Sequence, residues 1–174
     1  MAGHDTRMTG HDGPEYPENR TVATALAILA TRLREGTTSL TTVRLAEEYL
    51  LHRLMLEERE IFGALWLDAK NRLLACEYIA LGTINQLQIY PREVVKSALK
   101  HNAASGIIFH NHPGGDAAPS DSDKLMTMEM KQILNVVDVR LIDHIVVAGT
   151  QTQSFAKNGD IGRVHEHCPH LEKA

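Results

Sequence analysis

The sequence is poor in cysteine and has no long apolar run. Its 174 residues include two cysteines, Cys76 and Cys168, so a disulfide framework is not expected and a reducing compartment fits. No stretch of about 18 apolar residues is present that would cross a membrane, and no basic segment followed by a short apolar one has the pattern of a secretory signal. We therefore expect a soluble, cytoplasmic protein with no membrane partner.

An excess of positive charge is also missing. Lys and Arg number 18 against 22 Asp and Glu, which gives a net charge of -4. This balance argues against a strongly basic nucleic-acid-binding protein, although a local basic patch is compatible with it. The 43% of apolar and 23% of charged residues are ordinary for a globular protein, and the length suits one domain with a core rather than two.

The composition divides the chain into four parts. Residues 1–20 have hardly any apolar side chains, which predicts a flexible leader because too little surface can be buried to offset the entropy of ordering. Residues 21–40 carry apolar side chains at helical spacing and predict an N-terminal helical segment. Residues 41–163 are expected to form the main domain. Residues 164–174 contain three histidines and a cysteine without a surrounding core, which predicts a disordered or adventitiously metal-binding tail.

Strand and helix patterns alternate within the main domain. The predicted strands cover residues 61–67, 73–81, 105–109 and 140–149, and the predicted helices start near Thr41 or Thr42, at Pro91 and after Ser120, with a short last element at 154–156. The first two strands form a hairpin, whereas the later ones alternate with helices. The sequence therefore predicts the α/β class, with a mixed β-sheet flanked by helices in an α/β/α sandwich and with N-terminal helices.

The helix that starts at Pro91 has an apolar side and a basic side. Its inward-facing residues are predicted to be Val94, Val95, Ala98 and Leu99. Arg92, Lys96 and Lys100 recur at i, i+4 and i+8 and form a basic stripe on the other side. Such a stripe is usually just solvated, and the alternative is a weak association with DNA phosphates or with an acidic ligand.

Two histidines stand at the end of the third predicted strand. His110 and His112 are two residues apart, and residues two apart on a strand share a face, so both imidazoles can point to one place. Asn111 points the other way and is not expected to be a ligand. The sequence Pro113-Gly114-Gly115 then ends the regular pairing and turns the chain.

A helix start follows this turn and brings a carboxylate. Ser120 suits the N-cap position, and Asp123 falls in the first helical turn, from which it can reach back to His110 and His112. A single histidine is most often structural, and an aspartate at a helix N-terminus is ordinary. Two imidazoles and one carboxylate with an open fourth position, however, are the ligand set of a catalytic zinc site. The combination favours a metal site.

This combination resembles the JAMM motif of the JAB/MPN metal-dependent isopeptidases, which have a layered, cytidine-deaminase-like fold. The resemblance rests on His110-x-His112-Pro113 followed by Ser120-x-x-Asp123. The longer set of matching residues resembles the RadC-like branch more closely. This set consists of His110 to Asp116, Pro119-Ser120, Asp143-His144, Gly82-Thr83 and Pro91-Arg92-Glu93. The resemblance covers about residues 44–158. Gly115 departs from the family motif, in which serine is common at this position, but this difference affects no ligand. The resemblance implies Zn²⁺ as the cofactor.

The resemblance also implies the reaction, namely hydrolysis of a peptide or isopeptide bond by a zinc-activated water. The family uses an upstream glutamate as base and acid, just ahead of the first core strand. Glu60 matches this position best, and Glu57 and Glu58 are the alternatives if the register slips. Taken alone, the three would be a solvated charge run. The serine that Ser120 matches also contacts the substrate oxygen or the tetrahedral intermediate in the family.

Asp143 and His144 interrupt an otherwise apolar predicted strand. They either orient one of the ligand imidazoles or form a satisfied polar pair at the end of the sheet. The sequence leaves both interpretations open.

Two other functions are alternatives to the hydrolase. The first is a DNA-associated accessory protein or nuclease in DNA repair, which draws on the historical link of RadC-like proteins with repair and on the basic stripe; the acidic total argues against it. The second is a zinc deaminase, which needs a Pro-Cys-x-x-Cys motif that this sequence lacks.

Overall fold

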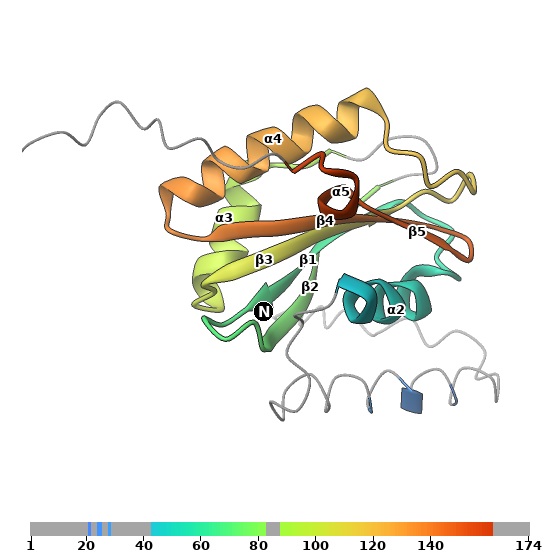
Figure 1. Ribbon diagram of the computed structural model, residues 1–174, viewed down its shortest axis with the longest axis horizontal. Coiled ribbons are helices and arrows are strands. Elements are labelled where there is room, and N and C mark those ends of the chain that lie inside the picture. Colours follow the sequence, from blue (N-terminus) through green and yellow to red (C-terminus); the bar gives the residue numbers. More distant parts are fainter. Residues whose placement is uncertain (1–20, 22–23, 26–27, 29–42, 83–87, 162–174) are drawn as a thin grey trace, which may run out of the picture.

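Five strands form one mixed sheet. The computed structural model describes residues 43–82 and 88–161, together with residues 21, 24, 25 and 28. In this part of the chain the strand order is β2-β1-β3-β4-β5, and β3 and β4 are parallel while the other neighbours are antiparallel (Figure 1). The strands are β1 Ile61–Leu67, β2 Leu73–Leu81, β3 Ser105–Asn111, β4 Arg140–Ala148 and β5 Gln151–Ser154.

Helices cover both faces of this sheet. The helices are α2 Val43–Leu54, α3 Pro91–Lys100, α4 Asp121–Val136 and the short α5 Phe155–Asn158. Apolar residues of α2 pack against one face, and those of α3 and α4 pack against the other. Figure 1 shows α2 and α4 on opposite sides of the sheet. The predicted α/β/α sandwich with a mixed sheet is confirmed.

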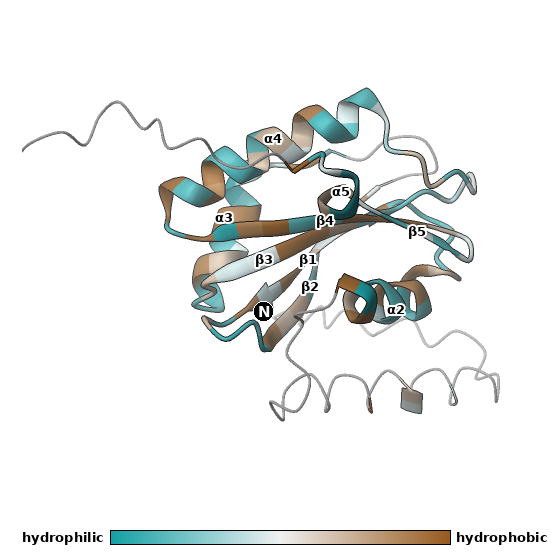
Figure 2. Ribbon diagram, viewed as in Figure 1, coloured by the Kyte–Doolittle hydropathy of each residue, from teal (hydrophilic) through white to brown (hydrophobic). Residues whose placement is uncertain are grey.

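The two central strands carry the core. Every residue of β1 and of β3 is buried, because both strands have a neighbour on each side and a helical layer on each face. Figure 2 shows hydrophobic residues along β3 and β4 between the layers. Side chains alternate between the two layers, so Phe62 and Ile108 face α3 and α4 whereas Phe109 faces α2. His110 is paired with Phe62 and therefore lies on the α4 face.

Some predicted details differ from the structure. The short element predicted at 154–156 is the junction of β5 with α5, and β5 itself was missed because its sequence, Gln151 to Ser154, is polar. Leu99 was predicted to face inward, but it is 57% exposed. The buried side of α3 is narrow, since the helix contacts the rest of the protein mainly through Val94, Ser97 and Ala98.

Several predictions fall where the structure gives no description. The leader at 1–20 and the tail at 164–174 lie outside the described residues, as does most of the segment 21–40, of which residues 21, 24, 25 and 28 are described and helical. Among the helices that are described, none is long and apolar enough to span a membrane.

Candidate metal centre

Three predicted ligand side chains meet at the end of β3. His110 Nε2 lies 2.9 Å from His112 Nε2 and 3.3 Å from Asp123 Oδ1, and His112 Nε2 lies 3.7 Å from Asp123 Oδ2. One donor atom from each residue lies within 4.8 Å of the others, and in the described part of the chain this is the group of histidine, cysteine and carboxylate side chains that could hold a metal. The convergence expected from the sequence is present.

The size of this group suits zinc. Tetrahedral zinc with ligand distances of about 2.0–2.1 Å places its donor atoms about 3.3 Å apart. His110 Nε2 lies 2.9 Å from His112 Nε2 and 3.3 Å from Asp123 Oδ1, and His112 Nε2 lies 3.7 Å from the other Asp123 oxygen, so the separations are centred on that value. The His110 side chain is only 2% exposed, whereas that of His112 is 24% exposed and that of Asp123 is 14% exposed. The group is therefore closed on the side of the sheet and open to solvent beside His112, as a site for an incoming substrate requires.

Local backbone rules place the two histidines. The parallel pairing of β3 with β4 continues for one residue beyond the strand, because the His112 amide donates to the Val147 carbonyl at 2.8 Å. The chain then turns, with the Gly115 amide donating to the His112 carbonyl at 3.1 Å and with Gly115 at φ +84°, a conformation that favours glycine. This turn brings the Asp116 carbonyl to within 2.7 Å of His112 Nδ1.

The contact with Asp116 fixes the tautomer of His112. A carbonyl oxygen only accepts hydrogen bonds, so His112 Nδ1 carries the proton and donates it. In the neutral imidazole, Nε2 is then an unprotonated nitrogen, and it points at His110 and Asp123. A lone pair directed at another imidazole and at a carboxylate can bind a cation placed between them. The residues present therefore fit a zinc ion.

A capping box places Asp123. The Ser120 hydroxyl accepts from the Asp123 amide at 3.1 Å, and Asp123 Oδ2 accepts from both the amide and the hydroxyl of Ser120, at 2.8 and 2.6 Å. Burial raises the pKa of Asp123, but the proximity of His110 and the hydrogen bonds from Ser120 outweigh it and hold the pKa well below its usual range. Asp123 is thus an ionised candidate ligand whose orientation the helix start determines.

Comparison with known proteins assigns the chain to a family. Residues 40–160 match the family model described as "RadC-like JAB domain", which is well over half of the chain. The chain belongs to the RadC-like JAB domain family. The UPF0758 protein YeeS of Escherichia coli (strain K12) is 42% identical over 142 residues, which are 82% of this chain and 96% of YeeS. A UPF0758 protein of Stenotrophomonas maltophilia (strain R551-3) is 55% identical over 111 residues, which are 64% of this chain and 47% of that protein. This chain thus spans about half the length of the S. maltophilia relative.

Glu60 of this RadC-like JAB domain lies just before the strand that pairs with the strand of His110. It is half-buried and directly precedes β1, two residues before Phe62, which pairs with His110. Extending that register by two residues predicts that Glu60 faces His112 on the same side of the sheet. Glu57 and Glu58 are exposed and lie farther from the strand. The structure therefore favours Glu60 among the three predicted candidates, and its role as base stays a prediction.

Asn111 holds the segment that carries Glu60. Its buried side chain donates to the Glu57 carbonyl at 3.3 Å and to the Arg59 carbonyl at 2.9 Å, and it accepts from the Ile61 amide at 2.7 Å. The backbone on both sides of Glu60 is therefore bound to one carboxamide. Asn111 was not expected to be a ligand, and its binding of the backbone around Glu60 was not predicted. The available signal was a polar residue at the end of an apolar strand.

Two further polar residues lie behind His110. His144 Nε2 is 2.8 Å from His110 Nδ1, and Thr127 Oγ1 is 2.6 Å from His144 Nδ1. Burial, and then the proximity of His110, lower the pKa of His144 well below its ordinary value. His144 thus contacts a predicted ligand, whereas its neighbour Asp143 binds backbone and Ser154 instead. Thr127 was missed, although its position four residues after Asp123 puts both on one side of α4.

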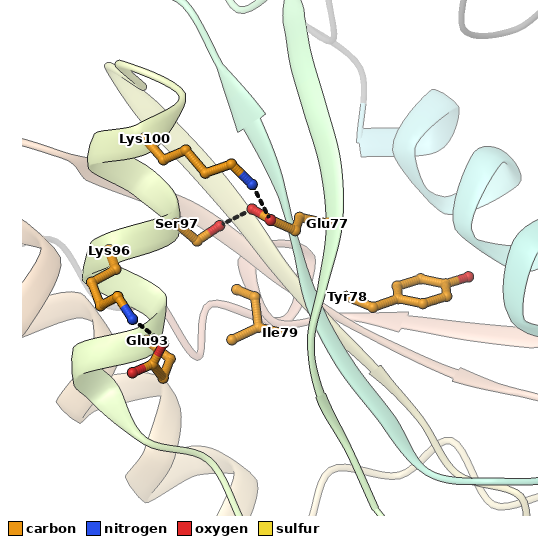
Figure 3. Close-up of a pocket in the computed structure, with 7 residues that line it drawn as sticks. All are labelled: Glu77, Tyr78, Ile79, Glu93, Lys96, Ser97 and Lys100. Carbon is orange, nitrogen blue, oxygen red and sulfur yellow. Dashed lines mark hydrogen bonds and ion pairs between the residues drawn. The ribbon is translucent and has the colours of Figure 1, made fainter. Parts of the chain in front are cut away.

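The predicted basic stripe is balanced by acidic neighbours. Figure 3 shows Lys96 beside Glu93 and Lys100 beside Glu77. The Lys96 ammonium lies 2.8 Å from a Glu93 oxygen, the Lys100 ammonium 2.7 Å from a Glu77 oxygen, and the Arg92 guanidinium 3.7 Å from Glu93. Each cation of the stripe is therefore already next to a carboxylate, which reduces the positive potential available to a phosphate.

Replacing Glu77 by glutamine is expected to remove a contribution to stability that depends on pH. Hydrogen bonds from Lys100 and Ser97 lower the pKa of Glu77 from 4.5 to about 2. A carboxyl with a lowered pKa stabilises the folded state fully above about pH 4.5, and this contribution is lost as the pH falls through about 2. In urea unfolding, the difference between wild type and Glu77→Gln should shrink from neutral pH toward about pH 2. The exposed Glu129→Gln is the control, and a difference constant over this range would contradict the prediction.

Proposed function

We propose that this RadC-like JAB domain is a zinc-dependent metallohydrolase that cleaves a peptide or isopeptide bond by attack of water. The convergence of two imidazole nitrogens and one ionised carboxylate beside an open face supports it most directly. Zinc held by His110, His112 and Asp123 would make a hydroxide available near neutral pH and polarise a carbonyl. The family assignment is consistent with this chemistry.

Glu60 would move the proton in this reaction. A carboxylate next to the attacking water takes its proton and later gives it to the leaving amine, a role that contributes typically about 10²–10⁴-fold to a rate. The backbone on both sides of Glu60 is held through Asn111, which suits a group that must stay aligned during two proton transfers.

Ser120 would act mainly through Asp123. Its hydroxyl proton is donated to Asp123 Oδ2, and its oxygen accepts from the Asp123 amide. This fixes the carboxylate on the metal side. The oxyanion-stabilising role expected from the resemblance stays a prediction and requires the hydroxyl to turn from Asp123 toward the substrate.

Hydrolysis should depend on the metal. A library of quenched fluorescent peptides, some with branched isopeptide links, would be offered to zinc-loaded protein, to chelator-stripped protein and to stripped protein given zinc again. We expect cleavage by the first and third samples only. Equal cleavage after stripping, or no cleavage of any probe by the zinc-loaded protein, would refute the proposed function. The cytoplasm is the expected compartment, and the natural peptide or isopeptide substrate would be found there.

DNA association through Arg92, Lys96 and Lys100 is the weaker alternative. Because each of these cations has an acidic neighbour, we expect no shift of a DNA duplex in gels at low salt. Binding that is present at low salt and weakens steeply as salt rises would instead assign phosphate contacts to this stripe, with Arg92→Ala, Lys96→Ala and Lys100→Ala as the variants that should abolish it.

A further inference from the structure

A chain of three hydrogen bonds connects a backbone carbonyl with the buried ligand His110. Thr127 Oγ1 lies 2.5 Å from the Asp123 carbonyl, His144 Nδ1 lies 2.6 Å from Thr127 Oγ1, and His110 Nδ1 lies 2.8 Å from His144 Nε2. The chain starts on the backbone of one candidate ligand and ends on the ring of another. Every side chain along it is buried.

The directions of these bonds follow from counting protons. The Asp123 carbonyl has no proton, so the Thr127 hydroxyl must donate its only one there. The same hydroxyl then accepts from His144 Nδ1–H. In a neutral His144, Nε2 is left without a proton and can only accept, so His110 Nδ1 must carry the proton that lies between the two rings.

Neutral His144 is what its surroundings favour. Its ring is 0% exposed, and its two nitrogens face a hydroxyl and an imidazole, not a carboxylate. Phe155 stacks on the ring with the two centroids 4.5 Å apart, which keeps water from that face. A second proton on this ring would therefore lie buried with no carboxylate bound to either nitrogen.

We propose that Thr127 and His144 are positioning residues that set the tautomer of His110, so that its Nε2 presents a lone pair to the metal. The chain achieves for the buried histidine what the Asp116 carbonyl achieves directly for His112. Both imidazoles then offer Nε2 to one point. The inference rests on the proposed zinc site, but it concerns metal binding and not hydrolysis.

The Thr127→Val variant tests this chain with little change in shape. It removes the hydroxyl, so His144 Nδ1 has no acceptor, and the ring can exchange tautomers and donate to His110 instead. Loss of an outer hydrogen-bond partner typically costs about 10–100-fold in metal affinity, and we expect a loss of that size for zinc in competition with a chromophoric chelator. Thr127→Ser keeps the hydroxyl and is the matched control, expected to bind zinc like the wild type.

Nitrogen NMR of the histidine rings in the zinc-loaded wild type provides a second, independent test. We expect His144 to carry its proton on Nδ1 and His110 to carry its proton on Nδ1. A proton on His144 Nε2, or zinc affinity of folded Thr127→Val equal to that of Thr127→Ser, would overturn the inference while leaving the hydrolase proposal intact. If the wild type binds zinc with these tautomers but cleaves no peptide, the inference stands and the proposed function fails. If the wild type binds no zinc, both fail.

Discussion

Glutamine at position 60 is expected to lower peptide or isopeptide hydrolysis by about 10²–10⁴-fold while zinc stays bound. Glutamine keeps the size and the hydrogen-bonding reach of glutamate but cannot take a proton. Glu60 is absent from the group of candidate ligands, which consists of His110, His112 and Asp123, so the metal affinity should not change. Zinc content by elemental analysis and initial cleavage rates on one probe peptide would be measured on the same preparation.

The neighbouring glutamates provide matched controls for this experiment. Glu57→Gln and Glu58→Gln make the same chemical change in the same segment, but both side chains are exposed, whereas that of Glu60 is half-buried. Both controls should keep wild-type rates. Full activity of Glu60→Gln would defeat the proposed mechanism. Loss of activity in Glu58→Gln alone would show that the base lies two residues, or one strand period, earlier in the sequence than assigned.

The candidate ligands could be predicted from the sequence because each depends on a local rule. The period of two along a strand puts His110 and His112 on one face, and the preference of serine for the N-cap puts Asp123 in the first turn of a helix. The central strands β1 and β3 could equally be predicted, since a buried strand with neighbours on both sides is a short, nearly continuous apolar run in the sequence. Their order in the sheet follows from how the segments pack.

What could not be predicted depends on contacts between distant segments. Glu77 neutralises Lys100 from a strand 23 residues away, so the stripe looks cationic in the sequence and is balanced in the fold. The position of Thr127 next to His144 requires α4 to lie across β4, which no spacing along the chain specifies. The short polar strand β5 forms because it pairs with the apolar β4, and its own sequence has no strand pattern.

Replacing His112 by alanine is expected to remove zinc and, with it, all metal-dependent hydrolysis. His112 is the ligand to test first, because its side chain is 24% exposed, whereas that of His110 is 2% exposed and is bonded to His144. Loss of His112 should therefore leave the core intact, so that a metal defect is not confused with unfolding. The loss of zinc affinity should exceed the 10–100-fold that is typical for outer hydrogen-bond partners of a ligand, since a donor atom itself is removed.

His101 offers a control with the same exposure, since its side chain is also 24% exposed, but it lies at the end of α3 beside Glu77 and outside the group of candidate ligands. His101→Ala should bind one zinc per chain like the wild type and cleave the same peptides. Zinc content, urea unfolding and cleavage would be measured for both variants. If His112→Ala bound zinc as tightly as His101→Ala, the meeting of Nε2 atoms and carboxylate at the end of β3 would not be a metal site, because a tetrahedral ion cannot lose one of three protein ligands without losing affinity.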